Sequence, residues 1–161
     1  MLHRETVSPS TLDLLVALCA HHSLASFSLA GGTSLALRFG HRISVDLDFF
    51  TSEPFDNEEL VAALNQDFAF EDRRRSATGV GAVVEGVKID LVKYRYPVVH
   101  PPQTVDGIRL MSLPDVIAMK LSAITNRGAK KVFLTCTRFL PNWDCPTFWS
   151  VIGRSFRTRI R

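Results

Sequence analysis

The sequence predicts an α/β (α+β) fold in which helices flank a mixed β-sheet. Two kinds of segment support this: stretches with apolar residues three or four apart, typical of helices, and short runs of alternating apolar and polar residues, typical of strands. The 161 residues, 46% hydrophobic and 22% charged, suffice for one globular domain with a sizeable core. No apolar run reaches the roughly 20 residues that span a bilayer, so no membrane partner is expected.

Four helices are predicted from apolar spacing and from residues that favour helix ends. In chain order they cover residues 10–22, 33–39, 55–65 and 113–126. Ser10 and Ser112 are suitable N-caps for the first and the last helix, because a serine hydroxyl can accept a hydrogen bond from an unpaired N–H group of the first turn. Gly40 ends the second helix, and Pro114 fits the first turn of the last.

Five strands are predicted from alternating patterns bounded by turn residues. They cover residues 27–30, 44–50, 68–75, 80–85 and 87–94, and residues 97–107 are expected to form a loop. Glu85-Gly86 is a tight turn between the last two strands. In the second strand, Val45, Leu47 and Phe49 alternate with two aspartates, which places the apolar and acidic side chains on opposite faces.

The positive charge of the chain is concentrated near its C-terminus. Residues 1–131 contain 14 Lys and Arg against 15 Asp and Glu, whereas residues 132–161 contain five Arg and one Asp. A basic nucleic-acid-binding surface spread over the whole fold is therefore not supported. The three cysteines lack the spacing of a zinc site, and no basic leader typical of a signal peptide is present, so a reduced, cytoplasmic location is expected.

Residues 29–50, which read LAGGTSLALRFGHRISVDLDFF, are the most informative stretch. A turn of Gly31, Gly32, Thr33 and Ser34 opens a helix. Glycine lets backbone N–H groups approach phosphate oxygens closely, and a helix N-terminus favours negative charge. The pattern predicts a phosphate-binding turn. The alternative is an ordinary glycine turn with a Thr or Ser cap, which would be preferred if no carboxylate pair followed.

A carboxylate pair does follow. Asp46 and Asp48 are two residues apart on a predicted strand, so both side chains point to the same face and can share Mg²⁺ ions. Transfer of a nucleotide with two metal ions commonly uses three carboxylates, and Asp90, in VKIDLVKY on a later strand, is the natural third. The alternative for all three is a solvated strand face.

Three polar residues near these motifs are further candidates for nucleotide binding. Arg42 and Ser44 lie between the glycine turn and the aspartates, and an arginine can bind phosphate with its planar fork of donors. Lys88, two residues before Asp90, can contact a phosphate or offset the acidic charges. A surface ion pair is the alternative for Arg42, and an exposed strand lysine is the alternative for Lys88.

Lys120 lies within VIAMKLSAI, on an otherwise apolar helix face where a lysine needs a partner. We interpret it as a catalytic or phosphate-binding residue, with extension of its ammonium group to the surface as the alternative. Arg127, Lys130 and Lys131 follow. They can hold phosphate or RNA, or they can interact with the negative end of the helix dipole.

These motifs resemble the nucleotidyltransferase AbiEii/AbiGii toxin family. The resemblance runs from about Phe27 to Lys131 and is carried by the stretch at 29–50, by VKIDLVKY and by MSLPDVIAMKLSAITNRGAKK. It implies a polymerase-β-like nucleotidyltransferase fold. Matched by position, it assigns phosphate binding to Gly32 and Thr33, metal binding to Asp46 and Asp48, the second motif to Lys88 and Asp90, and the catalytic lysine to Lys120.

The resemblance also implies what such a protein does. Similar proteins are bacterial toxins of toxin–antitoxin or abortive-infection systems, usually encoded beside a separate AbiEi-like antitoxin. They use a nucleoside triphosphate with Mg²⁺, and some add nucleotides to the 3′ end of tRNA, which blocks translation. We therefore expect a Mg²⁺-dependent nucleotidyltransferase whose partners are a nucleoside triphosphate, a tRNA acceptor and an antitoxin.

The resemblance ends after Lys131, so the predicted core domain covers residues 1–131. The family continues with a KKDFFDLY-like pattern and further helices, whereas residues 132–161 read VFLTCTRFLPNWDCPTFWSVIGRSFRTRIR, an irregular arginine-rich segment. One interpretation is a genuine tail that binds nucleic acid. We favour the hypothesis of a frameshift product, because plausible codons permit FFDLYALFAELGLSDFLECYREKFPNTDT in another frame. The C-terminal helices would then be missing, and catalysis by this copy weak or absent.

Two other functions stay open. A non-catalytic remnant would bind nucleotide or antitoxin without metal-dependent turnover. An RNA-binding module driven by the arginine-rich tail would bind with a steep salt dependence that is lost on deletion of residues 132–161.

Overall fold

The computed structural model describes residues 1–127. The predicted tail at residues 132–161, its proposed frameshift origin, and Lys130 and Lys131 lie outside the described residues, and the domain boundary at Lys131 stays a prediction. The chain divides into two compact units. The first comprises Met1–Arg95 and Pro102–Met111, and the second, within the described residues, comprises Tyr96–Pro101 and residues 112–127.

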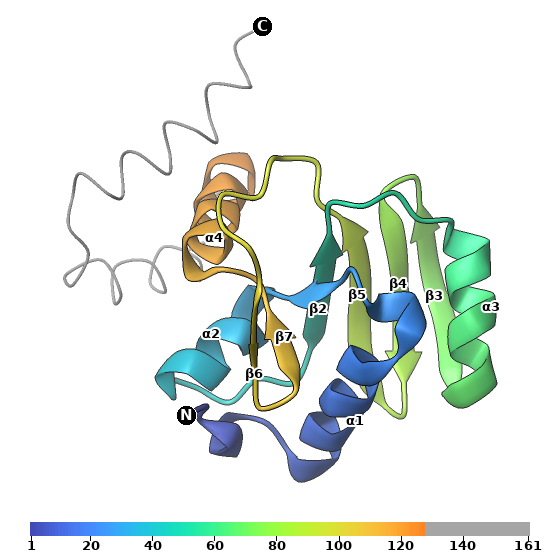
Figure 1. Cartoon of the computed structure of the whole chain (residues 1–161), viewed down its shortest axis with the longest axis horizontal. Helices are drawn as coiled ribbons and strands as arrows, with labels where there is room; N and C mark the ends of the chain where they lie inside the picture. The colour runs from blue at the N-terminus through green and yellow to red at the C-terminus, as the bar shows by residue number, and fades with distance from the viewer. Residues whose placement is uncertain (128–161) are drawn as a thin grey trace, which may run out of the picture. The chain divides into compact units, whose positions relative to one another are not determined.

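A mixed sheet forms the centre of the first unit (Figure 1). Its strands are β1 (Ser28–Leu29), β2 (Leu47–Thr51), β3 (Phe70–Ser76), β4 (Gly79–Val84), β5 (Val87–Lys93), β6 (Gln103–Val105) and β7 (Ile108–Leu110). They are arranged in the order β3-β4-β5-β2-β1-β7-β6. β2 pairs antiparallel with β1 but parallel with β5, and β1 pairs parallel with β7. The predicted mixed sheet is confirmed.

Three α-helices and two short 3-10 helices complete the first unit. They are η1 (Arg4–Thr6), α1 (Pro9–Ala20), η2 (His22–Leu24), α2 (Gly31–Phe39) and α3 (Asn57–Asp67). The N-cap of α1 is Ser8, whose Oγ accepts a hydrogen bond from the N–H of Thr11 at 3.1 Å. The prediction of Ser10 was wrong, because Pro9 occupies the first helical position, where its missing N–H costs nothing.

The segment that precedes β2 differs from the prediction. β2 begins at Leu47, so Asp46 and Val45 lie before the strand, and Val45 is 67% exposed. The prediction that an alternating strand begins at residue 44 was wrong, because it placed the Val45 side chain on the buried face. The N–H of Ser44 instead donates to the carbonyl of Thr6 in η1 at 2.8 Å, which ties this segment to the N-terminal part of the chain rather than to a neighbouring strand.

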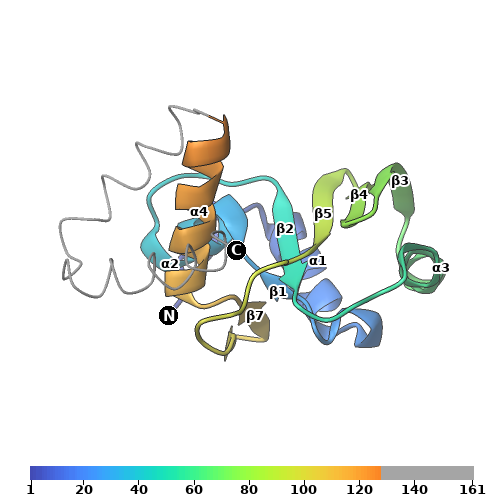
Figure 2. The same ribbon diagram turned by 90° about the horizontal axis from the view of Figure 1, so that it is seen from above.

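The strands β3, β4 and β5 form an antiparallel meander at one side of the sheet. The predicted tight turn at Glu85-Gly86 is confirmed, since Glu85 has φ +50° and Gly86 has φ +80°, as a two-residue hairpin turn requires. Figure 2 shows β2, β5, β4 and β3 in succession, with α3 beside β3. The amide of Asn57 in α3 donates to the carbonyl of Ser76 in β3 at 2.9 Å.

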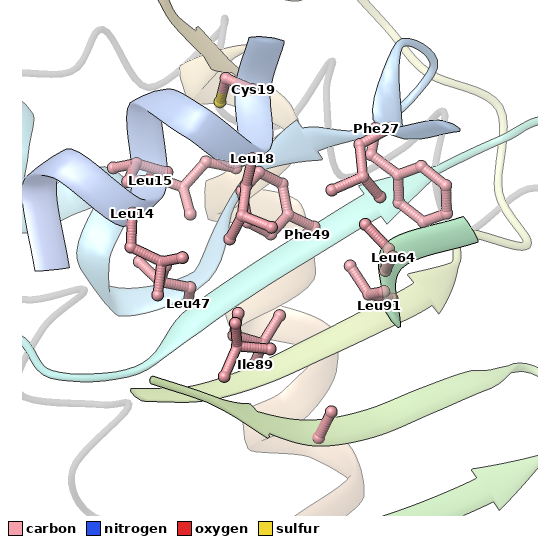
Figure 3. Close-up of a cluster of buried hydrophobic side chains, with 14 of the residues drawn as sticks. Leu14, Leu15, Leu18, Cys19, Phe27, Leu47, Phe49, Leu64, Ile89 and Leu91 are labelled. Atoms are coloured by element: carbon pink, nitrogen blue, oxygen red, sulfur yellow. The ribbon is translucent and has the colours of Figure 1, made fainter. Parts of the chain in front are cut away.

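Apolar side chains from α1, α3 and one face of the sheet form the core (Figure 3). The largest buried members shown there are Leu14, Leu15, Leu18, Phe27, Leu47, Phe49, Leu64, Ile89 and Leu91. Side chains alternate along a strand, so a core-facing Leu47 and Phe49 turn Asp48 to the opposite face. Ile89 and Leu91 do the same for Asp90. The core thus fixes which face of β2 and β5 carries the carboxylates.

The region predicted as a loop at residues 97–107 contains a strand. β6 pairs antiparallel with β7 through Gln103, Thr104 and Val105, and the turn between them has Asp106 at φ +53° followed by Gly107. The short strand and its exposed residues gave too little alternation to be recognised. β7 in turn adds to β1, since the N–H of Met111 donates to the carbonyl of Leu29 at 2.9 Å.

The second unit contains α4 (Leu113–Arg127), which confirms the predicted helix. Ser112 precedes it and accepts a hydrogen bond from the N–H of Asp115 at 3.3 Å. The buried Asp115 carboxylate also accepts hydrogen bonds from the N–H groups of Val99 and His100, at 2.9 and 3.2 Å. Within residues 1–127, no helix has both the length and the apolar character needed to cross a membrane.

Candidate functional site

Two of the predicted carboxylates lie side by side. Asp48 in β2 and Asp90 in β5 are direct register partners in a parallel strand pair. Neighbouring strands are about 4.8 Å apart, and partners in register point to the same face. The fold therefore brings together two aspartates that are distant in the sequence, on the face opposite the core.

The glycine turn at the start of α2 packs against Asp48, one member of this carboxylate pair. Gly31 has φ +64°, and a Cβ at this position would lie 2.0 Å from Oδ2 of Asp48. The backbone between β1 and α2 fixes this approach, because the N–H of Ala30 donates to the carbonyl of Asp48 at 2.8 Å. The N-terminus of α2 and the Asp48 carboxylate are thus in direct contact, so the end of a helix that favours anions lies beside a candidate metal ligand.

Thr33 and Ser44 hold the segment that carries Asp46. The Thr33 hydroxyl donates to the carbonyl of Asp46, and its oxygen lies 2.8 Å from Oγ of Ser44. Because a hydroxyl has one hydrogen to donate, the Ser44 hydroxyl is the donor of the second bond. Both residues are buried, while Asp46 itself is exposed. In this structure they position an acidic residue, and direct phosphate binding by Thr33 and Ser44 stays a prediction.

Ser34 is also engaged within the protein. Its buried hydroxyl accepts a hydrogen bond from Nη1 of Arg38 at 2.8 Å, and Nη2 of Arg38 donates to the carbonyl of Met111 at 2.6 Å. Burial lowers the pKa of Arg38 from its ordinary value, but the group stays charged because that value is far above neutral pH. Arg38 therefore links α2 to the end of β7, and phosphate binding by Ser34 stays a prediction.

Arg42 lies over Gly32 at the N-terminus of α2. A Cβ at position 32 would meet Nη2 of Arg42 at 2.0 Å, so the guanidinium fits only because residue 32 has no side chain. Across residues 1–127, no carboxylate lies within ion-pair distance of Arg42. A cation beside the positive end of a helix dipole is unfavourable on its own. An anion between them would be stabilised by both.

Lys88 offsets part of the charge of the acidic residues. Its ammonium lies 3.2 Å from Oδ2 of Asp90. The pKa of Lys88 is raised, first by this hydrogen bond, then by the charge of Asp90, and further by the charges of Asp46 and Asp48. One cation therefore interacts with all three predicted metal ligands. The sequence left three possibilities open for Lys88: a phosphate contact, compensation of the acids, or an exposed strand lysine. Its side chain is 59% exposed and contacts Asp90, which agrees with the last two, and phosphate binding by Lys88 stays a prediction.

The acidic residues suit a divalent cation by chemistry and by charge. Carboxylate oxygens are the ligands that Mg²⁺ prefers, and Asp46, Asp48 and Asp90 supply no other donor type. Their combined field already acts on Lys88. Within residues 1–127, however, no three His, Cys, Asp or Glu side chains are grouped closely enough to ligate one ion. Mg²⁺ binding by the three aspartates accordingly stays a prediction.

Lys120 belongs to the second unit. It lies on α4 and is half-buried, as an apolar helix face with one lysine predicts. Its proposed contact with phosphate and the alternative of extension to the surface both stay predictions.

The sequence did not indicate two residues that contact Asp90. Nη2 of Arg74 in β3 lies 3.1 Å from Oδ1 of Asp90, and a Cβ at Gly81 in β4 would lie 2.9 Å from the same oxygen. Arg74 stands in a run of three arginines whose members cannot be told apart by sequence. Only the strand register shows which of them faces the site.

The fold is that of nucleotidyltransferases. A proposed nucleotidyltransferase of Thermotoga maritima superposes with a TM-score of 0.58 at 14% identity, over 82% of this chain and 96% of its own length. The antibiotic-resistance factor ANT(2″)-Ia superposes with a TM-score of 0.57 at 12% identity, over 94% of this chain and 86% of its own. At these identities the similarity shows the fold alone. The polymerase-β-like fold expected from the motifs is confirmed.

The family follows from sequence comparison. Residues 13–132 match the model of the family described as nucleotidyl transferase AbiEii toxin, type IV toxin–antitoxin system. The chain belongs to this family. It is also 31% identical over 137 residues to an uncharacterised protein of Aquifex aeolicus. That match covers 81% of this chain but 66% of the Aquifex protein, so the chain spans just under two thirds of that relative's length.

Proposed function

We propose that this protein transfers a nucleotide from a nucleoside triphosphate to an acceptor, with Mg²⁺. The observation that carries the proposal is the contact of the α2 N-terminus, at Gly31, with the Asp48 carboxylate, whose register partner on β5 is Asp90. A site that combines a phosphate-binding turn with adjacent carboxylates suits a metal-bound triphosphate. Membership in the AbiEii family supports the same reaction.

Each group has a role that follows from its position. The N–H groups at Gly31 and Gly32 would bind the triphosphate, and the guanidinium of Arg42 would pair with a phosphate oxygen. Asp46, Asp48 and Asp90 would hold Mg²⁺, which when bound neutralises the charge that develops on the phosphates. Lys120 would contact a phosphate, as the family resemblance implies.

The proposed reaction is a displacement at phosphorus. An acceptor hydroxyl oxygen forms a bond to the α-phosphorus, the bond from that phosphorus to the β-phosphate bridging oxygen breaks, and pyrophosphate leaves. The hydroxyl proton passes to Asp90 or to solvent. We propose the 3′ end of tRNA as the acceptor, action in the cytoplasm, and a separate AbiEi-like antitoxin as partner; these three follow from the family resemblance.

Incubation of the full chain with bulk tRNA, each α-³²P-labelled nucleoside triphosphate and Mg²⁺ tests the proposal. Wild-type protein should label tRNA and release pyrophosphate, and Asp46→Ala should abolish both. Asp13→Ala, which removes an exposed carboxylate from α1, is the matched control and should keep full activity. Omission of Mg²⁺ should stop the reaction in every variant.

The outcomes separate the two leading functions. Labelling that survives in Asp46→Ala would contradict a catalytic role of the carboxylates. Nucleotide binding without labelling by wild-type protein would instead support a non-catalytic remnant.

A further inference from the structure

A row of four residues crosses the sheet from the candidate site to its edge. Asp48 in β2 pairs in register with Asp90 in β5, Asp90 with Gly81 in β4, and Gly81 with Arg74 in β3. The two ends of this row are a predicted metal ligand and an arginine that no sequence motif indicated. We propose that Arg74 is a positioning residue for the Asp90 carboxylate, an inference that rests on the proposed nucleotidyl transfer.

The contact between Arg74 and Asp90 passes over a strand. β3 and β5 are separated by β4, so their backbones are about 10 Å apart, twice the usual spacing of neighbouring strands. The Arg74 side chain can reach Asp90 across β4 only where the residue on β4 has no side chain. A Cβ at Gly81 would lie 2.9 Å from Oδ1 of Asp90 and 3.5 Å from Nε of Arg74. Gly81 therefore provides the space in which the two groups meet.

A β-bulge turns Arg74 toward the site. The pairing of β3 with β4 shifts between Asp72, which opposes Ala82, and Arg74, which opposes Gly81. In a regular ladder Arg73 would oppose Gly81, and Arg74 would point to the other face. Bulges commonly redirect a side chain beside an active site. The extra residue in β3 is what places Arg74 in the row.

The three consecutive arginines of β3 have different partners. Arg73 pairs with Glu71 of its own strand, and Arg75 pairs with Asp72 and with Glu58 of α3. These acidic partners lie outside the candidate site. Arg74 alone of the three contacts a candidate site residue. The two acids of β3 pair with Arg73 and Arg75, so the acidic partner of Arg74 lies on β5.

Arg74 and Lys88 together fix both oxygens of Asp90. Arg74 lies 3.1 Å from Oδ1 and Lys88 lies 3.2 Å from Oδ2. The side chain of Asp90 is 16% exposed, whereas that of Arg74 is 70% exposed. Exposed ion pairs contribute little to stability, so the contact matters for the orientation of the carboxylate rather than for folding. Loss of Arg74 should then alter the site and leave the fold intact.

Titration of the full chain with Mn²⁺, in the absence of nucleotide, tests this inference without requiring catalysis. Electron paramagnetic resonance measures how much of the Mn²⁺ is bound. Arg74→Lys keeps the charge but loses the planar fork, and should weaken Mn²⁺ binding about ten-fold, as loss of an outer-shell partner of a metal ligand commonly does. Gly81→Ala should act in the same direction, because the added Cβ displaces Oδ1. Arg73→Lys is the matched control and should bind Mn²⁺ as wild type does.

The outcomes are distinguishable. Arg74→Lys that binds Mn²⁺ as tightly as Arg73→Lys overturns the positioning role, even if Gly81→Ala fails to fold. Equal losses of thermal stability and Mn²⁺ affinity in both lysine variants also overturn it, since that pattern indicates a structural effect of β3. Wild-type protein that binds no Mn²⁺, or binds it unchanged after Asp48→Asn, overturns the metal site of the proposed function and this inference with it.

Discussion

Two glycine turns of this chain have similar backbones and different surroundings. Gly31 begins α2 with φ +64°, and Gly86 ends the β4–β5 turn with φ +80°. Both conformations are left-handed, which favours glycine over residues with a Cβ. A Cβ at Gly86 would have no heavy atom within 4 Å, whereas a Cβ at Gly31 would lie 2.0 Å from the Asp48 carboxylate.

The difference separates two reasons for a glycine. At Gly86 the backbone conformation alone requires it. At Gly31 the conformation and the close approach of a charged side chain both require it, and the second reason bears on the proposed function because it places a helix N-terminus beside a carboxylate. Sequence shows both turns as glycine turns, so substitution is the way to tell them apart.

The largest effect is expected for Gly31→Ala. The left-handed backbone costs about 1–2 kcal/mol for an L-residue, and the new methyl group forces the Asp48 side chain to move. We expect a lower unfolding temperature together with loss of Mg²⁺-dependent nucleotide binding, measured by calorimetry and by titration with a fluorescent ATP analogue. Binding that equals that of wild type would show that the Asp48 contact has no role in the site.

An intermediate effect, confined to binding, is expected for Gly32→Ala. Gly32 lies within α2, where alanine is favoured over glycine by up to about 1 kcal/mol. The added methyl group displaces only the flexible end of Arg42. Nucleotide affinity should fall about ten-fold, as expected for loss of one charge-assisted hydrogen bond, while the unfolding temperature stays the same or rises. A fall in the unfolding temperature would contradict this separation.

The smallest effect is expected for Gly86→Ala. Strain of about 1 kcal/mol should lower the unfolding temperature by roughly 2–4 °C in a chain of this size. Nucleotide and Mn²⁺ affinities should stay at wild-type values, because the turn faces open space. This variant is also the control for Gly31→Ala, since it carries the backbone strain without the contact. Weaker nucleotide binding here would contradict the distinction between the two turns.

The order of elements and the mixed sheet could be predicted because the responsible signals are local. Alternation identified β4 and β5, and glycine marked the turn between them. The start of β2 could not be predicted, since the pattern of Val45 and Leu47 is the same whether or not a neighbouring strand pairs with it. The hydrogen bond from Ser44 to Thr6 determines where β2 begins. Such a contact between distant segments does not appear in the spacing of apolar residues.

The candidate site, too, could be predicted only where local sequence motifs indicate it. Asp48, Asp90 and the Gly31 turn follow from short motifs, and the structure brings these three together. The contact of Arg74 with the site could not be predicted, because the orientation of Arg74 depends on a β-bulge that the sequence pattern does not indicate. The internal hydrogen bonds of Thr33 and Ser34 were equally invisible, since a buried hydroxyl and a phosphate-binding one have the same sequence signature.

The parallel pairing of β2 with β5 has a consequence for biosynthesis. The β3–β4 and β4–β5 hairpins join neighbouring segments and can form within microseconds, whereas β2 and β5 meet only after the intervening α3 and β3–β4 segments have been folded back. A nascent chain that has emerged from the ribosome only as far as β4 already contains Gly31 and Asp48 but has no Asp90 to pair with them. The Asp48–Asp90 pair therefore cannot form before β5 has left the ribosome, even if the segments that precede β5 have already folded.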